Sequence, residues 1–102
     1  MKEKFVKILF DLKCKWEGIA PDYRIFVNDE LFCERTYDLD NNHYLIEMLQ
    51  VTTVPGVEYK VRLDKVGPQI GEFRFSNHRV EYSDSPVRIY KAKETTFRFR
   101  SE

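Results

Sequence analysis

The sequence predicts an all-β protein, an antiparallel β-sandwich or jelly roll of about eight strands. Valine, isoleucine, threonine and the aromatic residues favour strands, and together they supply 35 of the 102 residues. Alanine, the strongest helix former, occurs only twice. Segments in which apolar and polar residues alternate are separated by turn residues at intervals of about 8–12 residues, which is typical of sandwiches and barrels.

Composition limits the class of protein further. The 17 basic and 17 acidic residues cancel, so the chain has no general attraction to nucleic acid or to an anionic membrane. A hydrophobic content of 42% argues against disorder, and no apolar run approaches the ~18 residues that span a bilayer. Because no linker or repeat divides the sequence, we expect a single β-sandwich domain over residues 1–102.

The longest alternating segment covers residues 6–16. Its even positions are apolar, and most of its odd positions are polar or charged. A period of two over this length predicts a long strand with one buried face. Leu9 interrupts the polar face and is a candidate for a second contact surface.

Residues 23–37 predict a β-hairpin. Tyr23, Ile25 and Val27 alternate with their neighbours in the first strand, and residues 30–37 form the second. Asn28 and Asp29 lie between the two strands, and both residue types tolerate the positive φ of a tight turn.

Residues 43–54 fit two interpretations. Tyr44, Ile46 and Met48 would share one face of a strand, whereas Leu45, Ile46 and Leu49 have helical spacing behind asparagines that could cap a helix. We favour the strand because residues 51–54 continue with strand formers.

The rest of the chain alternates over shorter lengths. Pro55-Gly56 predicts a turn before a strand at 57–63, and residues 67–71 break the chain again. Short strands are then expected at 73–75, 80–82, 87–91 and 97–99, with turns at 77–78 and 83–86.

No set of residues predicts an enzyme. His43 and His78 lie near expected turns, Cys14 and Cys33 lie on strand faces expected to point inward, and the sequence has no Gly-x-Ser-x-Gly element or phosphate-binding loop. Whether a cysteine and a histidine lie close enough to act as nucleophile and base depends on the fold, so this possibility stays open. We expect no catalytic residue and no cofactor.

The two cysteines also bear on the compartment. They lie on separate predicted strands and form no C-x-x-C pair, so we expect reduced thiols in a cytoplasmic protein. A single disulfide between neighbouring strands is the alternative. Charged residues interrupt the apolar start, so we expect no signal peptide and no membrane partner.

Residues 38–42 contain oxygen ligands of the kind that Ca²⁺ prefers, in Asp38, Asp40, Asn41 and Asn42. An EF-hand would need a glycine and a glutamate where this chain has His43 and Leu49, so that motif fails. Asx-turn chemistry is the preferred explanation, and we predict no metal site. A Ca²⁺ site built from separated loops, with Asp22 or Asp84, is the alternative.

Basic residues concentrate near the C-terminus, where Tyr90 and Phe99 could act as stacking platforms. Glu94 and Glu102 reduce the net positive charge of this segment. We therefore favour a solvated strand face, whose charges discourage pairing with another strand edge, and a nucleic-acid site is the alternative. The basic residues are Arg88, Lys91, Lys93, Arg98 and Arg100.

Four aromatic residues are candidates for a binding surface because they lie opposite, or at the edge of, the residues expected inside: Phe26, Phe32, Tyr37 and Tyr44. If the hairpin buries Tyr23, Ile25 and Val27 together with Leu31 and Cys33, Phe26 and Phe32 occupy its other face. Such a face either binds a glycan or is covered by a second layer or a second subunit. We favour covering, which predicts self-association.

Two segments resemble the small jelly-roll carbohydrate-binding modules of the xylan-binding type. In residues 18–31 a proline precedes an alternating strand that ends in Asn28-Asp29, and in residues 55–61 Pro55-Gly56 precedes a second alternating strand. The resemblance covers about residues 16–65, and it implies glycan recognition by polar groups of loops and by Ca²⁺. No ligand residue of that family maps onto this chain, and it lacks a paired-cysteine framework.

These observations predict a non-catalytic binding or structural module that acts by self-association or by docking on a larger protein assembly. A carbohydrate-binding module, with or without Ca²⁺, is the first alternative. A binder of single-stranded nucleic acid is the second alternative, disfavoured by the neutral net charge.

Overall fold

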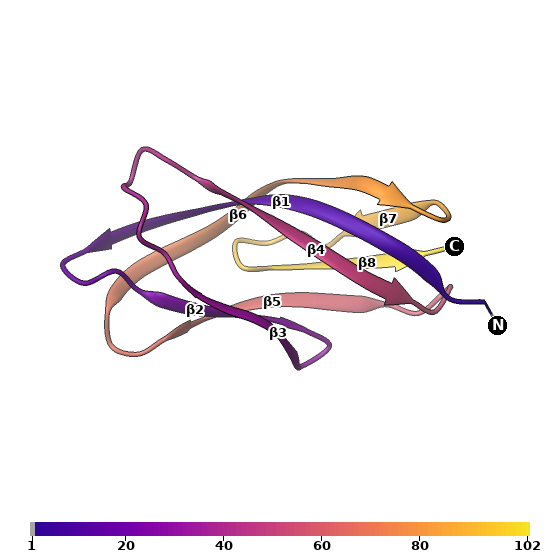
Figure 1. Cartoon of the computed structure of the whole chain (residues 1–102), viewed down its shortest axis with the longest axis horizontal. Coiled ribbons are helices and arrows are strands. Elements are labelled where there is room, and N and C mark those ends of the chain that lie inside the picture. The colour runs from indigo at the N-terminus through magenta and orange to yellow at the C-terminus, as the bar shows by residue number, and fades with distance from the viewer. Residues whose placement is uncertain (1) are drawn as a thin grey trace.

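A computed structural model describes residues 2–102, and its strands form two antiparallel sheets (Figure 1). The three-stranded sheet has the order β4-β1-β6, and the five-stranded sheet has the order β3-β2-β5-β8-β7. The strands are β1 (Lys4–Glu17), β2 (Asp22–Val27), β3 (Glu30–Thr36), β4 (Leu45–Thr53), β5 (Tyr59–Val66), β6 (Ile70–Ser83), β7 (Val87–Tyr90) and β8 (Thr96–Ser101). Within the described residues no helix is long and apolar enough to cross a membrane.

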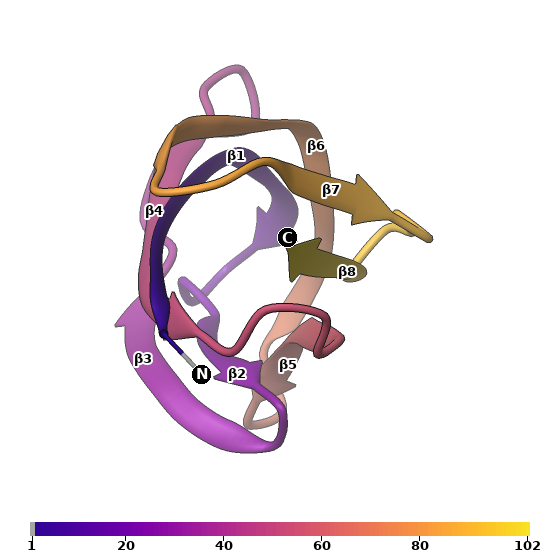
Figure 2. The ribbon, with the colours of Figure 1, turned by 90° about the vertical axis from the view of Figure 1, so that its right-hand side faces the viewer.

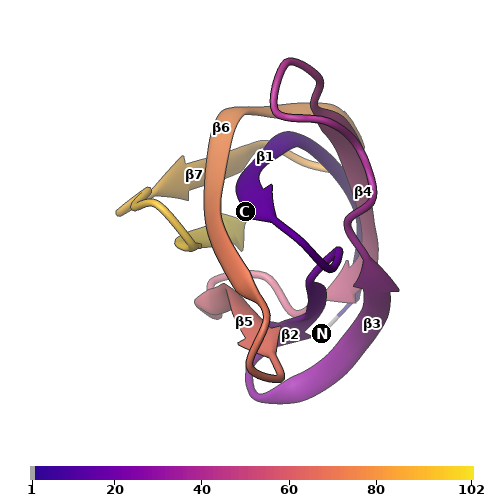
Figure 3. The ribbon, with the colours of Figure 1, turned by 90° about the vertical axis from the view of Figure 1, so that its left-hand side faces the viewer.

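The two sheets face each other and curve around one core, as the end-on views show (Figures 2 and 3). This arrangement confirms the predicted antiparallel sandwich. The buried apolar residues come from both sheets and from the segment after β3: Val6, Ile8, Phe10, Leu12, Cys14, Tyr23, Ile25, Tyr37, Leu49, Val61, Leu63, Phe73, Phe75, Phe97 and Phe99.

Strand β1 has the alternation that its sequence predicts. Its even positions from Val6 to Cys14 are buried, while its odd positions are half-buried or exposed. It is the central strand of its sheet and pairs antiparallel with both β4 and β6.

The hairpin of β2 and β3 is confirmed, with one correction. Asn28 and Asp29 have φ of 49° and 67° and form the predicted tight turn. A register shift after Ile25 pairs Phe26 with Leu31, although Ile25 is paired with Cys33. This bulge turns Leu31 away from the core, so the expectation that Leu31 is buried with Cys33 is wrong.

Residues 45–53 form strand β4, which confirms the strand interpretation over the helical one. Glu47, Leu49 and Thr53 point into the sandwich and are buried. Tyr44, Ile46 and Met48 share the opposite face, as the alternation predicts, and all three are exposed.

The expected turn at residues 77–78 is wrong. Strand β6 runs through this point without reversing, and the two predicted strands at 73–75 and 80–82 belong to it. Asn77 has a φ of 51°, and the ladder between β1 and β6 shifts register here, so the polar residues mark a bulge.

Gly71 lies where β6 approaches the loop before β2, and we expect Gly71→Ala to lower the free energy of unfolding by ~1–3 kcal/mol through overpacking. A Cβ at this position would lie 2.9 Å from Cγ of Pro21 and 3.3 Å from Sγ of Cys14. Urea unfolding measures the change, and adding Pro21→Ala should relieve part of it. An unchanged unfolding midpoint in Gly71→Ala would show that the contact is loose.

Candidate functional site

The four aromatic residues predicted to form a binding surface do not come together as one site. Tyr44 is exposed directly before β4, and Phe32 is partly exposed on β3. Phe26 is half-buried on β2, and the guanidinium of Arg62 on β5 lies 4.5 Å from the centre of its ring. That cation–π contact covers Phe26 within the same chain, so Phe26 needs no external partner.

The prediction that Tyr37 belongs to a binding surface is wrong, because Tyr37 is buried in the core. It shares the inward direction of Cys33 and Arg35, and its main-chain N–H donates to the carbonyl of Pro21, which continues the hairpin beyond β3. Its hydroxyl lies 3.1 Å from the carbonyl oxygen of His43 and 3.3 Å from that of Leu12, and it can donate to either. Tyr37 therefore anchors the 37–44 loop.

Phe32 and Tyr44 belong instead to a different set of exposed residues. We call Leu31, Phe32, Tyr44, Ile46 and Met48 the edge patch; their exposed fractions are 56%, 37%, 51%, 51% and 42%. Leu9 extends the patch inward, because it lies opposite Met48 on the outer face of β1 and is half-buried.

Four members of the edge patch lie on two outermost strands, β3 of one sheet and β4 of the other, and Tyr44 directly precedes β4. These strands lie on the same side of the molecule (Figures 2 and 3). Nε of Arg35 on β3 lies 3.3 Å from Oε1 of Glu47 on β4, which links the strands at one point. Near the start of β3 and the end of β4, Phe32 and Val51 line one groove of about 380 Å³. Polar residues that include Asn28, Glu30 and Thr52 line the same groove.

A buried carboxylate lies behind this side of the molecule. Glu47 is 2% exposed, and its Oε1 accepts a hydrogen bond of 2.7 Å from the hydroxyl of Tyr23 in addition to the Arg35 contact. Burial and the Glu47 carboxylate raise the pKa of Tyr23, so this hydroxyl remains a donor. Tyr23 and Arg35 thus provide polar partners for the buried carboxylate, and these contacts connect β2, β3 and β4.

The thiols and histidines lie in separate environments. Burial raises the pKa of Cys14 and, with the nearby Glu47 charge, that of Cys33, so both thiols stay protonated near neutral pH. Both cysteines are free, which excludes the disulfide alternative. Nδ1 of His43 contacts Asp40 at 2.6 Å, and His78 packs against Phe10, Phe75 and Phe97.

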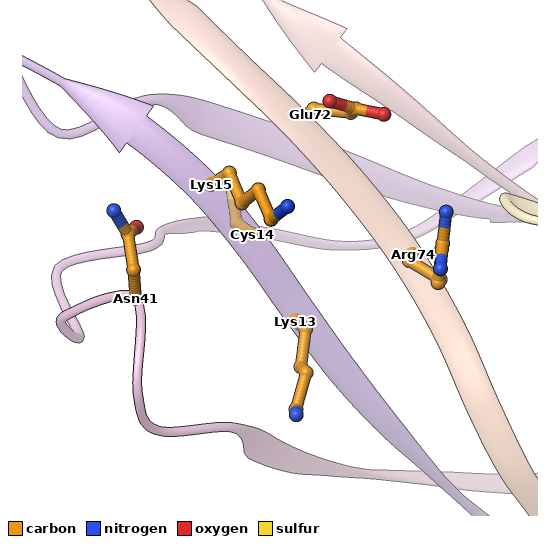
Figure 4. A pocket seen from close by; sticks show the side chains of 6 residues that line it. All are labelled: Lys13, Cys14, Lys15, Asn41, Glu72 and Arg74. Atoms are coloured by element: carbon orange, nitrogen blue, oxygen red, sulfur yellow. The ribbon is translucent and has the colours of Figure 1, made fainter.

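A second hollow of about 240 Å³ lies over β1 and β6 (Figure 4). Lys13, Lys15 and Arg74 line it together with Cys14, Asn41 and Glu72. The side chains of Lys13 and Lys15 point in different directions in Figure 4, and Arg74 lies 3.6 Å from Glu94. Because its charged groups do not converge, the hollow has the character of a solvated strand face.

The acidic loop at 38–42 has the Asx-turn chemistry expected from its sequence. Oδ1 of Asp40 accepts from the main-chain N–H of Asn42 at 2.9 Å and contacts His43. Among residues 2–102, no three histidine, cysteine, aspartate or glutamate side chains cluster as a metal site would require.

Three of the five C-terminal basic residues, all of them arginines, contact other groups of the chain. Arg98 pairs with Glu58 at 2.5 Å, and the hydroxyl of Tyr90 donates to the same carboxylate. Arg88 and Arg100 lie 5.7 and 6.0 Å from the centre of the Tyr90 ring. These contacts leave Tyr90 flanked by arginines, a poor platform for stacking bases.

Comparison of the chain with known protein families, with curated proteins and with solved structures found no match. The candidate site is therefore inferred from the structure alone, and the edge patch groups five exposed apolar side chains of β3, β4 and the residue before β4. Two of its five members, Phe32 and Tyr44, are among the residues predicted from the sequence. Ile46 and Met48 carried a signal in their alternation with Tyr44, whereas the exposure of Leu31 depends on the bulge in the hairpin.

The buried carboxylate makes a stability prediction. We expect Tyr23→Phe to lower the free energy of unfolding by ~1–3 kcal/mol, because Glu47 loses a donor inside the sandwich. Adding Glu47→Leu should recover part of that loss, since both polar partners are then replaced. Urea unfolding of the two single variants and the double variant measures the coupling free energy between Tyr23 and Glu47. Strictly additive losses of stability would contradict the predicted interaction.

His78 makes a prediction about pH. Burial lowers the pKa of His78 below its ordinary 6.5, and the charge of Asp11 opposes this only in part. As the pH falls below 6.5, the unfolded chain takes up a proton that the folded chain resists, so the free energy of unfolding decreases.

Urea unfolding at pH 7.5 and at pH 5 measures this effect, with His78→Phe as the comparison that subtracts the titration of carboxylates. The wild-type protein should lose more stability between these two pH values than the variant. Equal losses would show that His78 is protonated as easily in the folded state as in the unfolded state.

Proposed function

We propose that this protein is a non-catalytic binding module that makes protein–protein contacts through the edge patch, either with itself or with a larger assembly. The observation that carries the proposal is the exposure of five large apolar side chains, four on the neighbouring edge strands β3 and β4 and one directly before β4. Burying such side chains against a partner is favourable by roughly 25 cal/mol per Å² of apolar surface. Grouped apolar exposure of this kind is typical of interaction sites.

The chemistry of the remaining side chains supports a role without catalysis. Burial keeps both thiols protonated, and the contacts of the two histidines are with Asp40 and with aromatic rings, so among the described residues no thiol is activated by a histidine. Free cysteines are also what we expect for a protein that works in the cytoplasm.

Glycan binding is the second candidate, and one observation favours it. Phe32 lies in the groove beside the polar side chains of Asn28, Glu30 and Thr52, and an aromatic ring flanked by such groups suits a sugar. Binding on a glycan array, measured with and without Ca²⁺ and lost in Phe32→Ala, would establish this function in place of protein docking.

Photo-crosslinking tests the proposed docking surface. A benzoylphenylalanine in place of Tyr44 should link the protein, in cells that naturally contain it, to whatever covers the edge patch. Adding Ile46→Lys should abolish the adduct, because a lysine in the centre of the contact must be desolvated. Adducts with a second copy or with another protein, identified by mass spectrometry, both support the proposal.

The same photo-crosslinker at Ile70 is the matched control, since Ile70 is exposed but lies on β6 outside the edge patch. Equal adduct formation at positions 44 and 70 would contradict the proposal, because random collisions would then explain both.

A further inference from the structure

The two sheets have four outer strands, and they differ in how well they resist pairing with another strand. Strand β7 is only four residues long and carries Arg88. Strand β3 contains a bulge and the charged residues Glu30, Glu34 and Arg35. Strand β6 is interrupted by register shifts near Asn77. Short length, bulges and charges are the usual protections of edge strands.

Strand β4 has none of these protections. It pairs with β1 in an unbroken register from Lys4–Thr53 to Leu12–Leu45, and it contains no proline, glycine, lysine or arginine. Its single charged residue, Glu47, points into the sandwich and is satisfied there by Tyr23 and Arg35. Among the described residues no strand pairs with its other edge.

We propose that β4 pairs with β4 of a second copy of this chain, which joins two three-stranded sheets into one sheet of six. The inference rests on the proposed function and names the partner. A second copy fits because β4 presents an uncharged, apolar edge, and the most suitable complement is another strand without exposed charge. The other outer strands of the chain carry charges or a bulge and fit this edge less well.

Symmetry limits the register of such a pair. Two antiparallel copies in one sheet are related by a two-fold axis perpendicular to it, and paired side chains lie on the same face. The axis therefore passes midway between one residue and the same residue of the second copy, which lie opposite each other. A register centred on Glu47 would place two carboxylates side by side inside the sheets, which is unfavourable.

A register centred on Leu49 avoids this clash and pairs all nine residues of β4. It places Met48 opposite Gln50 of the second copy and Ile46 opposite Thr52 of the second copy, so no charge faces a like charge. Because β3 lies beside β4, the approach of a second copy also covers part of Leu31 and Phe32.

Sedimentation velocity over a wide concentration range tests the dimer. We expect a reversible dimer in the wild-type protein and a dissociation constant raised about tenfold or more by Ile46→Lys, since an edge lysine opposes strand pairing. Ile70→Lys, an equally drastic change at an exposed position outside β4, should leave the dissociation constant unchanged. Circular dichroism confirms that both variants are folded.

Disulfide trapping tests the register. In a Cys33→Ser background, an oxidised mixture of Met48→Cys and Gln50→Cys proteins should give the mixed dimer in large excess over either homodimer. Directly opposite residues have Cα atoms about 4.5–5.5 Å apart, within the range that a disulfide spans. Cys14 is buried and should not react.

The outcomes separate this inference from the proposed function. A monomer at every concentration with no mixed disulfide overturns β4 pairing, while a photo-adduct between position 44 and another protein would still support docking. A dimer that Ile46→Lys does not weaken also overturns it. A monomer without any specific adduct at position 44 rejects both.

Discussion

Burial of one face of β1 between two partner strands is the interaction on which the rest of the structure depends. Five side chains of this strand are buried, and β1 supplies both ladders of its sheet. Phe10 packs edge-on against Phe75 and Phe97, so the same strand joins the two sheets across the core. Losing such a buried ring typically costs about 3–5 kcal/mol, a large part of the stability of a small domain.

The core also contains a polar contact that constrains one side of the sandwich. Glu47 is buried, and it is tolerable there because Tyr23 and Arg35 come from strands of the other sheet to meet it. This contact holds β3 and β4 next to each other, although no ladder joins them. The edge patch is therefore a consequence of core packing, since the same β4 backbone that points Glu47 inward points Ile46 and Met48 outward.

The proposed function depends on the position of these side chains at the edge of a sheet. Single exposed apolar residues are common on protein surfaces, and Phe26 shows how one of them is covered within the chain by a cation–π contact. The members of the edge patch have no such cover on their outer side and lie beside a regular strand without exposed charge. Apolar surface and unpaired backbone then occur at the same place, which distinguishes β4 from the protected outer strands.

The sequence by itself determined the class of the fold, the strand faces of β1 and β4 and the hairpin turn at Asn28 and Asp29, because alternation and turn preference are local properties. It did not reveal that residues 77–78 form a bulge, since polar residues mark bulges as well as turns. Only the tertiary structure decided that Tyr37 is buried, that Leu31 is exposed and that Glu47 is held inside. The positions of Tyr37 and Glu47 depend on segments that meet across the sandwich, and that of Leu31 depends on a register shift in the hairpin, which alternation along one strand does not reveal.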